Sequence, residues 1–106
     1  MFRSIVLLLP LLIPLQVHAQ AGAAPAKGFV PDSATAVRIA VAVWIPIYGE
    51  HLIMSEQPFV AHLKDGVWTV TGSLPPAPPG TVMVGGTAVA KIAQRDGRVL
   101  FVVHYQ

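Results

Sequence analysis

The chain has 106 residues, no cysteine and a formal net charge of +2, and these properties exclude several classes of protein. Its length allows one domain with a single hydrophobic core. Without cysteine the chain can form no disulfide and offers no attachment point for the lipid of a bacterial lipoprotein. The small positive charge does not supply the clustered basic face that nucleic-acid binding requires, so we expect no nucleic-acid partner.

The first 19 residues predict a secretory signal peptide. Arg3 supplies the positive charge at its start, and an apolar stretch follows over residues 5–15. We expect cleavage after Ala19, although Ala21 fits the same small-residue pattern. An uncleaved anchor fits less well, because the apolar stretch is shorter than the roughly 20 residues that span a bilayer. We therefore expect a periplasmic or secreted protein that has no membrane contact after cleavage.

The rest of the chain predicts a flexible leader over residues 20–27 and a folded domain over residues 28–106. Asp32 is expected to cap an N-terminal helix whose apolar positions fall on one stripe. The stripe consists of Ala36, Ile39, Ala40, Val43, Trp44 and Ile47. Pro46 predicts that the helix either ends shortly before it or bends before its last turn, and Gly49 predicts a C-terminal cap.

Two Asp-Gly pairs predict β-hairpins after this helix. Asp65-Gly66 and Asp96-Gly97 each separate two apolar runs, and residues 50–57 before them predict a connector of mixed character. Two-residue turns at both places predict specific cross-strand pairs. These are Leu63 with Trp68, Ala61 with Val70 and Phe59 with Gly72 in the first hairpin, and Ile92 with Phe101 and Ala90 with Val103 in the second. The sequence therefore predicts an α+β domain, with one helix packed on a four-stranded antiparallel sheet in up-and-down order.

A proline-rich segment, residues 75–80, links the two hairpins. Proline cannot donate a hydrogen bond to a neighbouring strand, so we predict a partly extended loop here. The loop is either a rigid binding protrusion or a tolerated surface insertion. We favour the insertion, because surface loops absorb extra residues at little cost in stability.

The sequence indicates no catalytic or metal-binding site. On the predicted sheet His62 and His104 lie on opposite edge strands, roughly 14 Å apart, whereas zinc lies about 2 Å from each imidazole ligand. These two histidines and His51 are therefore expected to be solvated. Glu50 and Glu56 could form an acid–base pair, but carboxylates on a polar connector are usually solvated, and no nucleophile motif or phosphate loop accompanies them. We expect no enzyme activity, metal or cofactor.

The sheet face opposite the helix carries more branched apolar side chains than a solvated face needs. The residues with which we expect it to contact a partner are Val60, His62, Lys64, Val89, Lys91, Val102 and His104. The β-propensity of Val and Thr explains this composition equally well, so both interpretations stay open. The last strand, residues 99–103, has a bare apolar edge, and a homodimer through this edge is a further alternative.

Several short pieces of the chain resemble, in order and spacing, the nuclear-transport-factor-2-fold immunity proteins of bacterial polymorphic toxin systems. The pieces are Gly28-Phe29-Val30-Pro31, Thr35-Ala36, Ile39-Ala40, Tyr48-Gly49-Glu50, Pro58-Phe59, Trp68 with Val70, Gly72-Ser73-Leu74-Pro75, Gly85-Gly86, Asp96-Gly97 and Val99-Leu100. The resemblance covers nearly all of residues 28–106 and implies a cystatin-like or nuclear-transport-factor-2-like fold. It implies no functional residue.

The resemblance also implies a non-catalytic inhibitor that neutralises a cognate toxin by stoichiometric binding. An exported inhibitor cannot act on a toxin in the cytoplasm, so either the toxin acts in the envelope or the domain has acquired another use. The alternative is a small-molecule-binding or enzymatic member of the same fold, with a pocket between helix and sheet. That alternative would be disfavoured by a structure in which Trp44, Trp68, Phe59 and Phe101 fill this space.

Overall fold

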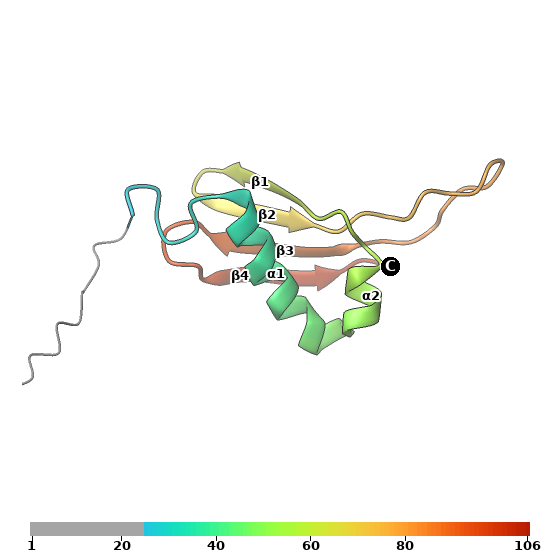
Figure 1. Cartoon of the computed structure of the whole chain (residues 1–106), viewed down its shortest axis with the longest axis horizontal. Helices are drawn as coiled ribbons and strands as arrows, with labels where there is room; N and C mark the ends of the chain where they lie inside the picture. Colours follow the sequence, from blue (N-terminus) through green and yellow to red (C-terminus); the bar gives the residue numbers. More distant parts are fainter. Residues whose placement is uncertain (1–24) are drawn as a thin grey trace, which may run out of the picture.

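The computed structural model describes residues 25–106, so the predicted signal peptide and most of the predicted leader lie outside the described residues. The described part contains two helices and a four-stranded antiparallel sheet with strand order β1-β2-β3-β4 (Figure 1). The elements are α1 (Ser33–Tyr48), α2 (Glu50–Met54), β1 (Val60–Lys64), β2 (Val67–Thr71), β3 (Ala88–Ala93) and β4 (Val99–His104). The predicted α+β class and strand order are confirmed. Neither helix in residues 25–106 has the length and hydropathy that crossing a bilayer requires.

The caps predicted for α1 are both present. The Asp32 carboxylate accepts a hydrogen bond from the Thr35 amide at 2.8 Å, and Gly49 follows the helix with a φ of 92°. The helix does not end before Pro46, which was one of the two predicted outcomes, but continues past it. Pro46 leaves the carbonyl of Ala42 without its intrahelical donor, and both residues are exposed, so water can satisfy that carbonyl.

The predicted stripe of α1 faces the sheet as far as Trp44, which is buried, whereas Ile47 beyond it is exposed. The connector predicted after α1 contains a helix that was not predicted, because residues 50–54 form the short helix α2 with Ile53 fully buried. The Ser55 hydroxyl donates to the Leu52 carbonyl at 2.5 Å at the end of α2. Helical periodicity needs a longer window than five residues to become visible, which is why the sequence did not reveal this helix.

The first hairpin has the predicted register. Leu63 pairs with Trp68, and Ala61 pairs with Val70. Asp65-Gly66 forms the expected two-residue turn, with φ values of 51° and 75°. The third predicted pair, Phe59 with Gly72, lies beyond the ends of β1 and β2.

The second hairpin does not have the predicted register. Ala90 pairs with Val102 instead of Val103, so β4 is displaced by one residue along most of its length. Because successive side chains of a strand point to opposite faces, a displacement of one residue reverses the faces of β4. Val102 and His104 therefore lie on the helix side of the sheet, and Phe101 and Val103 lie on the opposite face.

The displacement originates in the loop after β3. The Ala93 amide donates to the Arg98 carbonyl at 2.8 Å, so the loop contains residues 94–97 instead of the two residues predicted. An irregularity beside Ile92 then compensates for part of this difference, and Ile92 pairs with Val99 instead of Phe101. The physical reason for the wrong prediction is therefore the longer loop and the bulge, neither of which an Asp-Gly pair reveals.

The segment before α1 holds this loop in place. The amides of Phe29 and Val30 donate to the carbonyls of Arg95 and Gln94, each at 3.0 Å. In return, the buried indole nitrogen of Trp68 donates to the Val30 carbonyl at 2.8 Å. The start of the domain is thus bonded both to the β3–β4 loop and to the middle of the sheet.

The core lies between α1 and the sheet. Its fully buried large side chains are Val30, Trp44, Ile53, Val70 and Ile92. The rings of Trp44 and Phe59 lie 5.7 Å apart, and Trp68 is also buried. Phe101, expected in this space from the predicted register, lies on the other face of the sheet and is exposed. The helix–sheet interior is therefore filled by aromatic and aliphatic side chains, without the contribution of Phe101.

Candidate functional site

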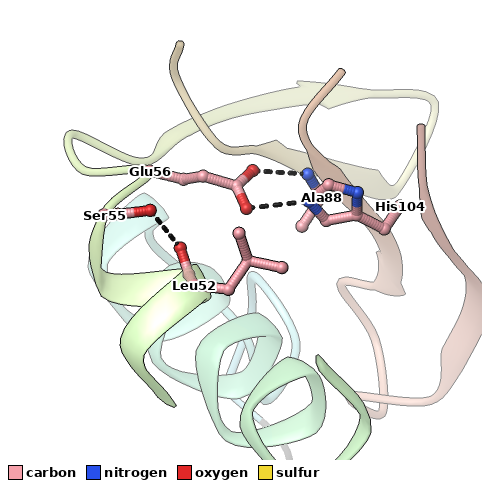
Figure 2. A network of polar contacts seen from close by, with 5 residues as sticks. All are labelled: Leu52, Ser55, Glu56, Ala88 and His104. Carbon is pink, nitrogen blue, oxygen red and sulfur yellow. Dashed lines mark hydrogen bonds and ion pairs between the residues drawn. The ribbon is translucent and has the colours of Figure 1, made fainter. Parts of the chain in front are cut away.

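Glu56 is the one charged side chain that is buried within residues 25–106, with 4% of its surface exposed. It follows α2, and its carboxylate points toward β3 and β4 (Figure 2). One oxygen, Oε1, accepts a hydrogen bond from the Ala88 amide at 2.7 Å. The other, Oε2, lies 2.9 Å from Nε2 of His104. The two oxygens thus join the segment after α2 to the first residue of β3 and the last residue of β4.

This arrangement corrects two predictions. Glu56 and His104 were both expected to be solvated, but Glu56 is buried and the His104 side chain is only 17% exposed. The ring of Tyr48 lies 5.4 Å from that of His104 and covers it. His51 and His62 are exposed, as predicted.

Glu56 also lies at the base of a long projection between β2 and β3. We call this projection, residues 72–87, the β2–β3 arm; it extends well beyond the end of the sheet (Figure 1). The Glu56 backbone carbonyl accepts a hydrogen bond from the Ser73 amide at 2.7 Å. The Ser73 hydroxyl in turn donates to the Pro58 carbonyl at 2.5 Å. Gly72 is so close that a Cβ there would lie 2.7 Å from Oε1 of Glu56.

The returning side of the arm is held by β4 and the residue after it. The Tyr105 amide donates to the Thr87 carbonyl at 3.1 Å. Gly86 packs directly on Tyr105, and a Cβ at Gly86 would overlap the backbone carbonyl of Tyr105. Together with the bond from Ala88 to Glu56, these contacts fix both sides of the arm at its base.

The outer part of the arm, unlike its hydrogen-bonded base, is exposed. The proline-rich segment forms the predicted loop, and the outgoing limb that contains most of it, residues 73–79, is exposed from Leu74 onward. The returning limb, residues 81–86, contains Val82 and Val84, which are 86% and 92% exposed and are the most exposed large apolar side chains of residues 25–106. From Gly66 to Ala90 the chain has no ionisable side chain. The arm is therefore an uncharged apolar projection with a fixed base.

The predicted contact face of the sheet is only partly as expected. Five of its predicted residues lie on the face opposite α1, namely Val60, His62, Lys64, Val89 and Lys91. The placement of Val102 and His104 on that face is wrong, because the register of β4 turns both toward the helix. Phe101 lies on that face instead, and Nζ of Lys91 lies 5.7 Å from the centre of the Phe101 ring. That this face binds a partner stays a prediction.

The described side chains offer little for catalysis or metal binding. No group of three or more His, Asp or Glu side chains gathers in residues 25–106. Both oxygens of Glu56 are engaged, and Glu50 is exposed on α2. An open hollow of about 340 Å³ lies at the far end of the sheet from the arm, between the segment at Pro25 and the loop at Arg95. It is separate from the helix–sheet interior, where a pocket was considered.

Sequence reasoning missed both Glu56 and the character of the arm. Glu56 lies in a segment with no periodic pattern, and its partner His104 was assigned to the wrong face. The arm did carry a signal, since a long run without any ionisable residue is unusual on a surface loop. That the proline-rich loop is a tolerated insertion stays a prediction.

Comparison with known proteins gives one finding. A family model described as NTF2 fold immunity protein matches residues 35–106. No curated protein and no solved structure gives a significant match. The matched residues include most of α1, all of the sheet, the β2–β3 arm and Glu56. The resemblance seen in the sequence is thereby confirmed.

Proposed function

The chain belongs to the NTF2-fold immunity protein family, and from this premise we propose that it neutralises a cognate bacterial toxin by stoichiometric binding. The family match carries the proposal, because immunity proteins act by binding a toxin partner. The match covers the whole sheet and both candidate binding regions, so it applies to the folded domain as described.

The proposal includes export to the periplasm or the medium. It is supported by the signal-peptide pattern of the first 19 residues, with cleavage expected after Ala19. An exported immunity protein can meet only a toxin that acts outside the cytoplasm. We therefore propose that the toxin acts in the envelope.

We further propose that binding involves no chemistry on the part of this protein. The filled helix–sheet interior supports this, since the space where an enzymatic relative would hold a ligand contains Trp44 and Ile53. The carboxylate of Glu56 supports it as well, because hydrogen bonds within the fold engage both of its oxygens. The surfaces left for a protein partner are the sheet face around Lys91 and Phe101 and the β2–β3 arm.

Co-purification with the product of the adjacent toxin-like gene tests the proposal. The toxin is made catalytically inactive, carries the affinity tag, and is mixed with the purified untagged immunity protein. We expect a complex with one copy of each chain, measured by light scattering after size exclusion. A matched control uses an unrelated inactive nuclease or peptidase of similar charge, and this control should retain no immunity protein. Absence of a complex with the cognate toxin would refute the proposal.

A further inference from the structure

The returning limb of the arm has unused backbone hydrogen-bonding groups. Among residues 25–106, no backbone bond is made by the amides of residues 82–86, and the tip is closed only by Thr81, whose amide donates to the Pro78 carbonyl at 3.1 Å. The outgoing limb cannot serve as a partner strand, because prolines occupy four of its positions and proline has no amide hydrogen. The returning limb therefore presents an extended edge that its own chain cannot pair.

The side chains of this limb alternate as those of a strand do. Val82 and Val84 are almost fully exposed, while Met83 between them is 37% exposed. Gly85 follows and has no side chain to obstruct the backbone, whereas Gly86 packs on Tyr105 at the base of the arm. Strand addition to a sheet edge uses these two features together, main-chain hydrogen bonds for affinity and pockets for alternate side chains for specificity.

The absence of charge suits the arm for burial against another protein. Removing a charged group from water is costly unless the partner supplies a matching charge. No residue from Gly66 to Ala90 is ionisable, so burying the arm imposes no such cost. The apolar surfaces of Val82 and Val84 would leave water in the same step.

The fixed base makes the arm ready to bind. Glu56 accepts hydrogen bonds from Ser73 on one limb and from Ala88 after the other, at 2.7 Å each. The prolines restrict the outgoing limb further, since each ring fixes its own φ. A projection that is ordered before binding loses less conformational entropy in the complex.

We propose that the returning limb, residues 81–86, binds the toxin by adding as a β-strand to an exposed sheet edge, with Val82 and Val84 in apolar pockets of the toxin. This inference rests on the proposed function and identifies the element that would carry it. The occupant is a protein edge strand, since the free amides of the limb need backbone carbonyls at the spacing of a strand.

The test compares two variants that add the same charge to opposite limbs. Val84→Asp places a carboxylate where a pocket is expected, and Ala77→Asp places one on the proline-rich limb. We expect Val84→Asp to weaken binding of the inactive toxin at least about 100-fold, and Ala77→Asp to weaken it less than about threefold. Both residues are exposed, so the melting temperature should stay unchanged in both variants.

Hydrogen exchange measures independently whether the backbone amides of the limb become protected in the complex. In the complex of the wild-type proteins, the amides of residues 82–86 should exchange at least about tenfold more slowly than in the free protein. Equal binding by Val84→Asp and the wild type, or unchanged exchange of these amides, would overturn the inference while leaving the proposed function intact. No binding by the wild type would refute the proposed function and this inference with it.

Two further outcomes would assign the limb to another occupant and overturn the inference. One is a dimer of the wild-type protein alone in sedimentation that Val84→Asp abolishes. The other is flotation of the wild type, but not of Val84→Asp, with vesicles of phosphatidylethanolamine and phosphatidylglycerol. We expect the protein alone to sediment as a monomer and to remain unbound by these vesicles.

Discussion

Backbone hydrogen bonds join the chain at both ends of the sheet, and at the second end the buried carboxylate of Glu56 adds side-chain bonds to them. At the first end, the amides of Phe29 and Val30 bond to the β3–β4 loop, and the Gln94 amide donates to the Gly66 carbonyl at 2.9 Å. At the second end, one carboxylate connects α2 to Ala88 and to β4 (Figure 2). The second end also carries the β2–β3 arm.

The difference shows where the fold depends on single side chains. Backbone bonds persist when a side chain is replaced, so substitution of the exposed Phe29 side chain should leave the bonds at the first end in place. A buried carboxylate cannot be replaced in this way, because its loss leaves the amide of Ala88 and the ring of His104 without a partner. Stability should therefore respond strongly to replacement of Glu56 at the end that carries the arm.

Replacement of Glu56 by alanine should have the largest effect. It leaves a buried amide and a largely buried imidazole unpaired, and we expect the free energy of unfolding to fall by about 3 kcal/mol. Urea denaturation measures this loss. Glu50→Ala is the matched control, since Glu50 is an exposed glutamate at the start of α2, the helix that Glu56 follows, and its loss should cost less than about 0.5 kcal/mol. Equal effects of the two substitutions would contradict the role given to Glu56.

Gly86→Ala should have the next largest effect. The added methyl group would overlap the backbone of Tyr105, which cannot move without breaking the bond from its amide to Thr87. We expect a loss of about 2 kcal/mol in thermal or urea unfolding. Gly72→Ala should also destabilise the fold, because the added Cβ would lie 2.7 Å from Oε1 and 2.9 Å from Cβ of Glu56, whose carboxylate is bonded to Ala88 and His104. A loss below about 0.5 kcal/mol for Gly86→Ala would contradict the packing of Gly86 on Tyr105.

His104→Ala should cost about 1.5 kcal/mol, because it removes one of two hydrogen bonds to a buried carboxylate. His104→Gln keeps a side-chain donor and should recover part of this loss. His62→Ala is the matched control on the other edge strand, where the side chain is exposed and its removal should have little effect. Chemical denaturation of the three variants shows whether stability is lost only when the partner of Glu56 is replaced, or also when another histidine on an edge strand is replaced.

Asp32, which caps α1, should show the smallest effect. Hydrogen bonds from the Thr35 hydroxyl and amide hold the pKa of Asp32 below its usual value of 3.8. A lowered folded-state pKa means that the cap stabilises the fold above pH 3.8 and that this contribution is lost as the pH falls through the folded-state value. Asp32→Ala should therefore be less stable than the wild type at pH 7, and the difference should shrink under strong acid. A difference that is constant with pH would exclude the cap as its cause.

The two hairpins show how far the sequence predicts the fold. Asp65-Gly66 adopts the two-residue turn, and the register of the first hairpin follows from it. Asp96-Gly97 has the same two residue types, but its loop has four residues and accepts a backbone hydrogen bond from Val30. The longer loop thus has both a local bond, from the Arg98 amide to the Asp96 carboxylate, and bonds to a distant part of the chain, and the Asp-Gly pair alone indicates neither.

The candidate site was harder to predict for the same reason. Burial of Glu56 depends on α2, on the base of the arm and on the face to which His104 points. None of these is visible as a periodic pattern, and the wrong register of β4 placed His104 on the opposite face. The family resemblance, by contrast, could be recognised because it depends on the order of short pieces and not on their contacts.

The proposed function is tested most directly by the survival of cells in which the product of the adjacent toxin-like gene is directed to the periplasm. We predict that the full chain protects these cells and that a variant lacking residues 1–19 does not, because it stays in the cytoplasm. Immunoblots of the periplasmic and cytoplasmic fractions confirm where each variant is found. Death of cells in which the full chain is present in the periplasm would contradict a role as the immunity protein of this toxin.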